Sequence, residues 1–97
     1  MAYRIILSQS AKKALAATIP AKYVSAIIAF IEGPLADNPR RVGKPLRDDL
    51  EGYYSARRGE YRIIYRIVDE TVEVYVEKLS HRAHAYGQSI AAARRRL

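Results

Sequence analysis

The sequence of 97 residues contains no cysteine and no tryptophan, and its only histidines are His81 and His84. Without cysteine the chain can form no disulfide bond, no cysteine-ligated zinc site and no thiol nucleophile. Two histidines are too few for a histidine-rich metal site. These absences exclude thiol chemistry, and we expect neither a bound metal nor a cofactor.

Long hydrophobic runs are also missing. The longest apolar stretch, from Val24 to Ile31, is interrupted by Ser25 and is too short to cross a bilayer. The first ten residues lack the basic and then apolar pattern of a signal peptide. A chain of this length usually builds one hydrophobic core. We therefore expect a single cytoplasmic domain over residues 1–97 with no membrane partner, in which residues 88–97 form a basic tail or a helix end.

Acidic residues are scarce: ten Asp and Glu face seventeen Lys and Arg, which gives a net charge of +7. The basic residues gather in three segments, at 40–47, 57–66 and 82–96, with several tyrosines among them. This excess favours a polyanionic partner, with nucleic acid first and an acidic protein second. Arginine for phosphates and tyrosine for base stacking is the composition of a surface that binds single-stranded RNA. A solvated basic face is the alternative.

The common catalytic motifs are absent as well, since the chain has no P-loop, GxGxxG, GxSxG or HExxH sequence. We expect the acids Asp48, Asp49 and Glu51 to cap a loop. RNA cleavage suits what remains, because the 2′-OH of the substrate attacks the phosphorus. The protein then supplies proton transfer and cations for the transition state. Arginine binds two phosphate oxygens at once through two of its nitrogens. Dense positive charge lowers the pKa of a tyrosine hydroxyl by favouring the phenolate, which can then accept a proton.

Hydrophobic periodicity predicts an α+β fold with the order β-α-α-β-β-β-α. The expected strands cover residues 3–7, 53–57, 61–68 and 71–79. We expect a short helix capped by Ser8 or Ser10, a second from Pro20 to Asn38-Pro39, and a third from Ser80 onward. Residues 40–52 read as a loop. The predicted architecture is an antiparallel sheet with an N-terminal αα-hairpin packed on one face.

Alternation within the strands predicts which side chains face the core. In residues 61–68 the odd positions from Tyr61 to Ile67 share one face, and the even positions from Arg62 to Val68 share the other. In residues 71–79 we expect Val72, Val74 and Val76 inward, and Thr71, Glu73, Tyr75 and Glu77 outward. Further core or supporting positions are expected at Tyr3, Tyr23, Val24, Ile27, Ile28, Phe30, Ile31, Ile63 and Val74.

Three stretches, LADNPRRVGKPLRDDLEG, SARRGEYRIIYRI and SHRAHAY, resemble the RelE toxins of the RelE/ParE toxin–antitoxin superfamily. The resemblance covers residues from about 3 to 86. It implies a compact fold like that of the microbial RNases and cleavage of mRNA in the ribosomal A site, which inhibits translation. It also implies neutralisation by a cognate antitoxin, with operator DNA bound only through the toxin–antitoxin complex.

The resemblance also implies roles for individual residues. Arg62 and Arg82 match the family's phosphate-contacting arginines, and Tyr86 matches the tyrosine that stacks on the substrate base. Some members carry two lysines, one of them used in proton transfer, where this chain has Tyr53 and Ser55.

That proton-transfer role is therefore open. The candidates for it are His81, Arg57, Arg58 and Lys44. The predicted catalytic residues are Arg62, Arg82, Tyr86 and His81. The predicted substrate-binding residues are Lys44, Arg47, Tyr53, Ser55, Arg57 and Arg58. Two other functions remain open, namely a ParE-like inhibitor of DNA gyrase on the same fold and an inactive member that binds only antitoxin or operator DNA.

Overall fold

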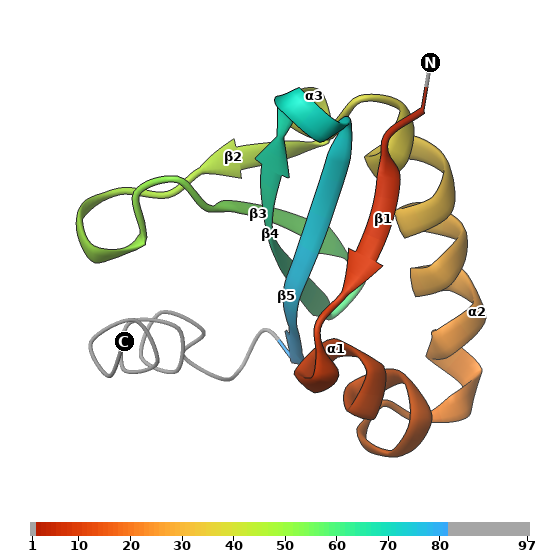
Figure 1. The fold of residues 1–97 in the computed structure, drawn as a ribbon. Helices are drawn as coiled ribbons and strands as arrows, with labels where there is room; N and C mark the ends of the chain where they lie inside the picture. The colour runs from red at the N-terminus through yellow and green to blue at the C-terminus, as the bar shows by residue number, and fades with distance from the viewer. Residues whose placement is uncertain (1, 82–97) are drawn as a thin grey trace.

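The computed structural model describes residues 2–81 (Figure 1). The helix expected from Ser80 onward does not begin there, because Ser80 and His81 belong to the last strand, and the rest of that prediction lies outside the described residues. The strands are β1 (Arg4–Leu7), β2 (Gly43–Pro45), β3 (Tyr54–Arg58), β4 (Tyr61–Val68) and β5 (Glu73–His81). The α-helices are α1 (Gln9–Lys13), α2 (Ala21–Phe30) and α3 (Pro39–Val42). π-Helical turns η1 (Ala14–Thr18) and η2 (Ile31–Leu35) extend the first two helices. Short 3₁₀ turns are η3 (Asp48–Leu50) and η4 (Asp69–Thr71).

The strands form one sheet in the order β1-β5-β4-β3-β2. The pairs from β2 to β5 are antiparallel, as predicted. The first strand departs from the expected antiparallel sheet, because β1 runs parallel to β5. A parallel neighbour needs a crossover connection, and the helices between β1 and the meander supply it. The α+β class is confirmed, and the sheet is mixed.

The helical hairpin covers one face of this sheet, as predicted (Figure 1). The core between them combines small and branched residues of the helices, such as Ala11, Ile27 and Ile31, with β-sheet residues such as Ile63 and Val76. We call the opposite face of the sheet the far face.

The sequence explains why the hairpin has these ends. The Ser8 hydroxyl caps α1 by accepting a hydrogen bond from the Ala11 amide at 3.0 Å, as expected for an N-cap serine. Pro20 precedes α2 and stops the first helix. The second helix passes Gly33-Pro34 through the π-helical turn η2 and is followed by Asn38-Pro39.

Two further local predictions are wrong. Residues 40–52 are not a simple loop, because they contain most of α3, all of β2 and the turn η3. Val72 is 39% exposed because it lies in the turn before β5 with a φ of 54°. Tyr23, expected as a core or supporting residue, is 39% exposed and supports the core from its edge, where its ring packs against Tyr61.

The alternation predicted for β4 is confirmed. Tyr61, Ile63 and Tyr65 are buried in the core, and Ile67 packs against it. Ile64 on the far face is fully buried too. The register of β4 with β5 shifts between Ile64 and Tyr65, so the strands carry a bulge there.

Leu35 in η2 is fully buried in the core, so its truncation should clearly destabilise the fold. We expect Leu35→Ala to lower the free energy of unfolding by about 2–5 kcal/mol, because it removes apolar contacts and leaves a cavity. Denaturant unfolding measures this change. Leu50→Ala, at a half-buried position outside the core cluster, is the control and should cost clearly less. Equal losses would place the core elsewhere.

Candidate functional site

The strand register brings several of the predicted site residues into two neighbouring rows on the far face. Arg57 of β3 lies directly opposite Arg62 of β4, and Arg62 lies opposite Ser80 of β5. In the next row, Lys44 of β2 lies opposite Ser55 of β3. Directly opposite residues on paired strands point to the same face, with Cβ atoms about 4.5–5.5 Å apart.

A groove of about 500 Å³ runs along these rows between β2, β3 and β4. Its described lining includes four cationic side chains, Arg41, Lys44, Arg57 and Arg62, and no aspartate or glutamate. Ser55 also lines it. Four cations in one concave surface create a positive potential, which favours binding of an anion in the groove.

The charged groove lowers the stability of the fold. Arg57 and Arg62 are directly opposed, and like charges at such positions destabilise a strand pair. The Nε atom of Arg62 is buried, so this side chain is less exposed than the sequence suggested. The Ser80 hydroxyl is also buried and has no hydrogen-bond partner within residues 2–81. Costs of this kind are typical of binding sites.

The opposed arginines give a direct prediction. We expect Arg57→Gln to raise the free energy of unfolding by about 0.2–1 kcal/mol in low salt, because it relieves the repulsion. The gain should shrink in 1 M salt, where charges are screened over about 3 Å. Thermal melts at both salt concentrations measure it. Arg58→Gln removes the neighbouring cation from the other face and is the control; an equal gain there would assign the effect to net charge alone.

The structure separates the remaining predicted residues from the groove. Arg58 and His81 lie opposite Tyr61, on the core face, and the His81 ring meets the Tyr61 ring edge-on with centroids 5.4 Å apart. The sheet therefore lies between His81 and Arg62. Arg47 and Tyr53 do not line the groove, although Tyr53 is only two residues before Ser55, which does. Arg82 and Tyr86 lie outside the described residues.

One groove residue was missed by the site prediction, and two basic residues have other roles. Arg41 belongs to the basic run at 40–47, but only the pairing of β2 with β3 reveals that it lines the groove. Its neighbour Arg40 makes a two-point ion pair with Asp69, at 3.0 and 2.6 Å. Arg66 pairs with Glu77 at 3.1 Å. The positive surface is therefore narrower than the sequence suggested.

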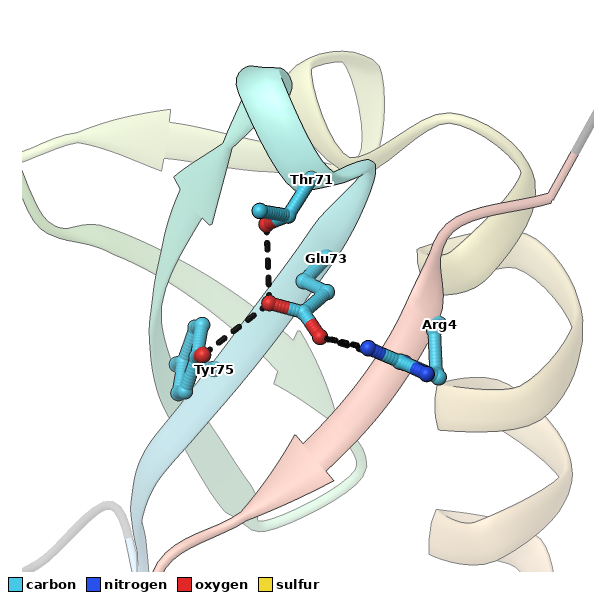
Figure 2. A network of polar contacts seen from close by, with 4 residues as sticks. All are labelled: Arg4, Thr71, Glu73 and Tyr75. Carbon is cyan, nitrogen blue, oxygen red and sulfur yellow. Dashed lines mark hydrogen bonds and ion pairs between the residues drawn. The ribbon is translucent and has the colours of Figure 1, made fainter.

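A second polar cluster on the far face surrounds Glu73 at the β1–β5 end of the sheet (Figure 2). This side chain was expected to point outward into water, but Glu73 is only 6% exposed. Its carboxylate accepts hydrogen bonds from Arg4, from the Thr71 hydroxyl at 2.8 Å and from the Tyr75 hydroxyl at 3.0 Å. These donors, Arg4 above all, lower the pKa of Glu73 from 4.5 to about 2.

The lowered pKa of Glu73 makes stability depend on pH. A carboxylate with a depressed folded-state pKa stabilises the fold above its unfolded pKa of 4.5, and this contribution is lost as the pH falls toward 2. We expect Glu73→Gln to melt at a lower temperature than the parent at pH 7, and the difference to shrink below pH 4.5. Glu70→Gln, at an exposed acid in η4, is the control. A constant difference across this pH range would contradict the assignment.

The tyrosines whose pKa changes do not behave as bases. Burial raises the pKa of Tyr65, and the hydrogen bond to Glu73 raises that of Tyr75. Neither ring lies in the groove. Within residues 2–81 there is also no cluster of three His, Asp or Glu side chains that could hold a metal ion. No helix in the same range is long and apolar enough to span a membrane.

Comparison with known proteins identifies the family. Residues 5–86 match the family described as "ParE toxin of type II toxin-antitoxin system, parDE". The chain is 42% identical over 84 residues to Toxin RelE of Mycobacterium tuberculosis (strain ATCC 25618 / H37Rv), covering 87% of this chain and 86% of that protein. The chain belongs to the RelE/ParE family of type II toxin–antitoxin toxins.

Other members of this toxin family agree in sequence and fold. Toxin RelG of the same organism is 42% identical over 86 residues, which cover 89% of this chain and 98% of RelG. The crystal structure of the toxin–antitoxin complex RelBE2 from Mycobacterium tuberculosis contains a chain that is 40% identical, with a TM-score of 0.80. The match covers 84% of this chain and 100% of that one. The RelE resemblance and the α+β architecture are thus confirmed.

Proposed function

We propose that this type II toxin is an endoribonuclease that cleaves mRNA, most efficiently on the ribosome, and so inhibits translation. The observation that carries the proposal is the groove on the far face, where Arg41, Lys44, Arg57 and Arg62 line one surface and the described lining contains no aspartate or glutamate. An RNA phosphate provides the negative charge that such a groove requires.

The chemistry of the groove fits attack by the substrate's own 2′-OH on the adjacent phosphorus. The 2′-OH gives its proton to solvent water or hydroxide as it attacks, since the described lining of the groove holds no carboxylate or histidine. The transition state gathers negative charge on the phosphate oxygens, and preorganised cations stabilise that charge. Arg57 and Arg62 supply two guanidinium groups at one place on the sheet. No metal ion is required for this route. The resemblance assigns a second phosphate contact to Arg82 and base stacking to Tyr86.

Proton transfer to the leaving 5′-oxygen is assigned to Lys44. Of the four candidates for the open role, His81 and Arg58 lie on the other face of the sheet, which leaves Arg57 and Lys44 in the groove. A guanidinium does not release its proton in a protein, whereas an ammonium does. Lys44 also lies directly opposite Ser55, one of the positions where some relatives carry lysine.

The proposed partners are mRNA in the ribosomal A site and a cognate antitoxin that neutralises the toxin in the cytoplasm. The antitoxin proposal is supported by the RelBE2 structure of Mycobacterium tuberculosis, which is a toxin–antitoxin complex. Operator DNA would be bound only through such a complex.

A second function is favoured by one specific observation, because the matching family is described by the name of ParE. A ParE-like toxin would bind and inhibit DNA gyrase without cleaving RNA. The name Toxin RelE of one relative at 42% identity and the cationic groove favour the nuclease. A catalytically inactive member, which the missing strand lysines would explain, is the third possibility.

Inducible expression separates these functions. We expect growth arrest together with new 5′ ends inside translated mRNAs, and unchanged supercoiling in a parallel gyrase assay. Growth arrest with intact mRNA and trapped gyrase–DNA complexes would support the ParE-like function instead. Intact mRNA and normal growth at confirmed expression would indicate an inactive member.

A further inference from the structure

Two of the four groove cations come from a short segment that the sheet core holds in place. Residues 39–45, which we call the 39–45 segment, comprise α3 and β2 and carry Arg41 and Lys44. Arg57 and Arg62 stand on the long strands β3 and β4 instead. The spacing between the two cation pairs therefore depends on how this segment is fixed to the sheet.

Tyr65 fixes the start of the segment from inside the core. Its side chain is fully buried, and its hydroxyl donates a hydrogen bond of 2.5 Å to the carbonyl oxygen of Pro39, which is itself buried. The Tyr65 ring stacks on Tyr54 with centroids 5.6 Å apart and an interplanar angle of 19°. Burial also raises the pKa of the Tyr65 phenol, so the hydroxyl keeps its proton and remains a donor.

Gly43 allows the same hydroxyl to reach the segment. A methyl group on Gly43 would clash with the Tyr65 hydroxyl and would lie 3.0 Å from the Ser55 carbonyl oxygen. The backbone of Gly43 is extended, with a φ of −127°, so the glycine is needed for space and not for its backbone freedom. Lys44 follows directly, and a shift of β2 at Gly43 would move it.

A surface contact anchors the same segment a second time. Arg40 holds Asp69 through two nitrogens, and the Tyr3 hydroxyl donates to the same carboxylate at 2.8 Å. Both side chains are about half exposed, so this ion pair contributes less than the buried hydrogen bond. The main support of the segment is therefore Tyr65.

We propose that Tyr65 is a positioning residue, which sets the distance between the cation pair Arg41/Lys44 and the cation pair Arg57/Arg62 so that one RNA strand engages both. This inference rests on the proposed nuclease function. Tyr65 touches no substrate, and it acts through Pro39 and Gly43. The two cation pairs then contact neighbouring phosphates, and the Lys44 ammonium reaches the leaving oxygen only while the segment keeps its place.

Tyr65→Phe tests the proposal, because it removes the hydroxyl and keeps the ring. We expect single-turnover cleavage to fall about ten- to hundredfold, the size of effect that a displaced catalytic group produces. Binding of a non-cleavable RNA with 2′-deoxy sugars should weaken, and the slope of log K against log salt should fall by about 0.7 for each phosphate contact that is lost. Tyr75→Phe is the control, since it removes a phenol hydroxyl from the Glu73 cluster outside the groove.

A second variant, Gly43→Ala, distinguishes a positioning role of Tyr65 from a role in folding stability alone. Alone, it should displace β2 and lower cleavage and the salt slope as Tyr65→Phe does. The double variant Gly43→Ala/Tyr65→Phe should cleave RNA faster than Gly43→Ala alone. The reason is that the added methyl group clashes most strongly with the Tyr65 hydroxyl, which Tyr65→Phe removes. A purely structural role predicts lower melting temperatures, with the salt slope and the rate per folded molecule unchanged.

The two proposals fail in different ways. If the parent protein cleaves RNA while Tyr65→Phe keeps the parent rate and slope, the positioning role is overturned and the nuclease function stands. Absence of recovery in the double variant would also count against the role of Tyr65. If the parent neither binds nor cleaves RNA, the nuclease function and this inference are overturned together.

Discussion

Replacing Arg62 by alanine is expected to lower the rate of single-turnover RNA cleavage by about 10²–10³-fold. Arg62 lines the groove opposite Arg57, and in the proposed mechanism its guanidinium stabilises the charge that develops on the phosphate. The free energy of unfolding should change by less than about 1 kcal/mol. The loss of its partly buried stem is offset by relief of the repulsion from Arg57.

Matched variants separate charge from geometry at this position. Arg62→Lys should restore only part of the rate, because an ammonium cannot bind two phosphate oxygens as a guanidinium does. Arg66→Ala removes the arginine four residues along the same strand face, which is paired with Glu77, and should leave the rate close to that of the parent. Parent activity in Arg62→Ala would move the site elsewhere. A loss of activity that follows the melting temperature would make Arg62 structural.

Exchanging Lys44 for arginine should lower cleavage by about 10²-fold, a size typical of losing a general acid. The exchange keeps the positive charge, so RNA affinity and its salt dependence should stay close to the parent values. What is lost is the proton, because arginine does not deliver it to the leaving 5′-oxygen. Single-turnover cleavage and equilibrium binding measured on the same RNA show the difference.

A chemically modified substrate makes the Lys44 test specific. A 5′-thio leaving group departs without a proton, so Lys44→Arg should cleave this substrate at nearly the parent rate. Lys12→Arg makes the same exchange on α1, outside the groove, and should leave cleavage at the parent rate. If Lys44→Arg cleaves the ordinary RNA at the parent rate, Lys44 only binds phosphate and the proton comes from another group.

The strands were predictable where one physical signal dominates. Alternation alone defined β4 from Tyr61 to Val68 and placed Tyr65 on the same face as Ile63, which is the core face in the structure. The three residues of β2 have no such signal, because glycine and proline at its ends are typical of turns. The strand exists because Pro39 and Gly43 fit against Tyr65, and this tertiary contact leaves no periodic pattern in the sequence.

In the candidate site too, features set by strand alternation were predictable and features set by tertiary contacts were not. Arg62 was placed correctly on the face opposite Tyr61, because a strand alternates strictly. The side of His81 was not predictable, since the bulge between β4 and β5 changes which β5 residues face the core. Glu73 was expected to be solvated, but its partner Arg4 is 69 residues away in sequence and joins it only through the parallel β1–β5 pair.

The ends of the cleaved RNA test the central claim most directly, because they report which group attacked the phosphorus. Toxin is mixed with ribosomes carrying a labelled mRNA, and the upstream fragment is analysed by mass spectrometry, with a second mRNA bearing one 2′-deoxy sugar at the cleavage site. We expect a 2′,3′-cyclic phosphate on the upstream fragment, a 5′-hydroxyl on the downstream fragment, and no cleavage of the 2′-deoxy mRNA. A 3′-hydroxyl with a 5′-phosphate, or cleavage of the 2′-deoxy mRNA, would contradict the account.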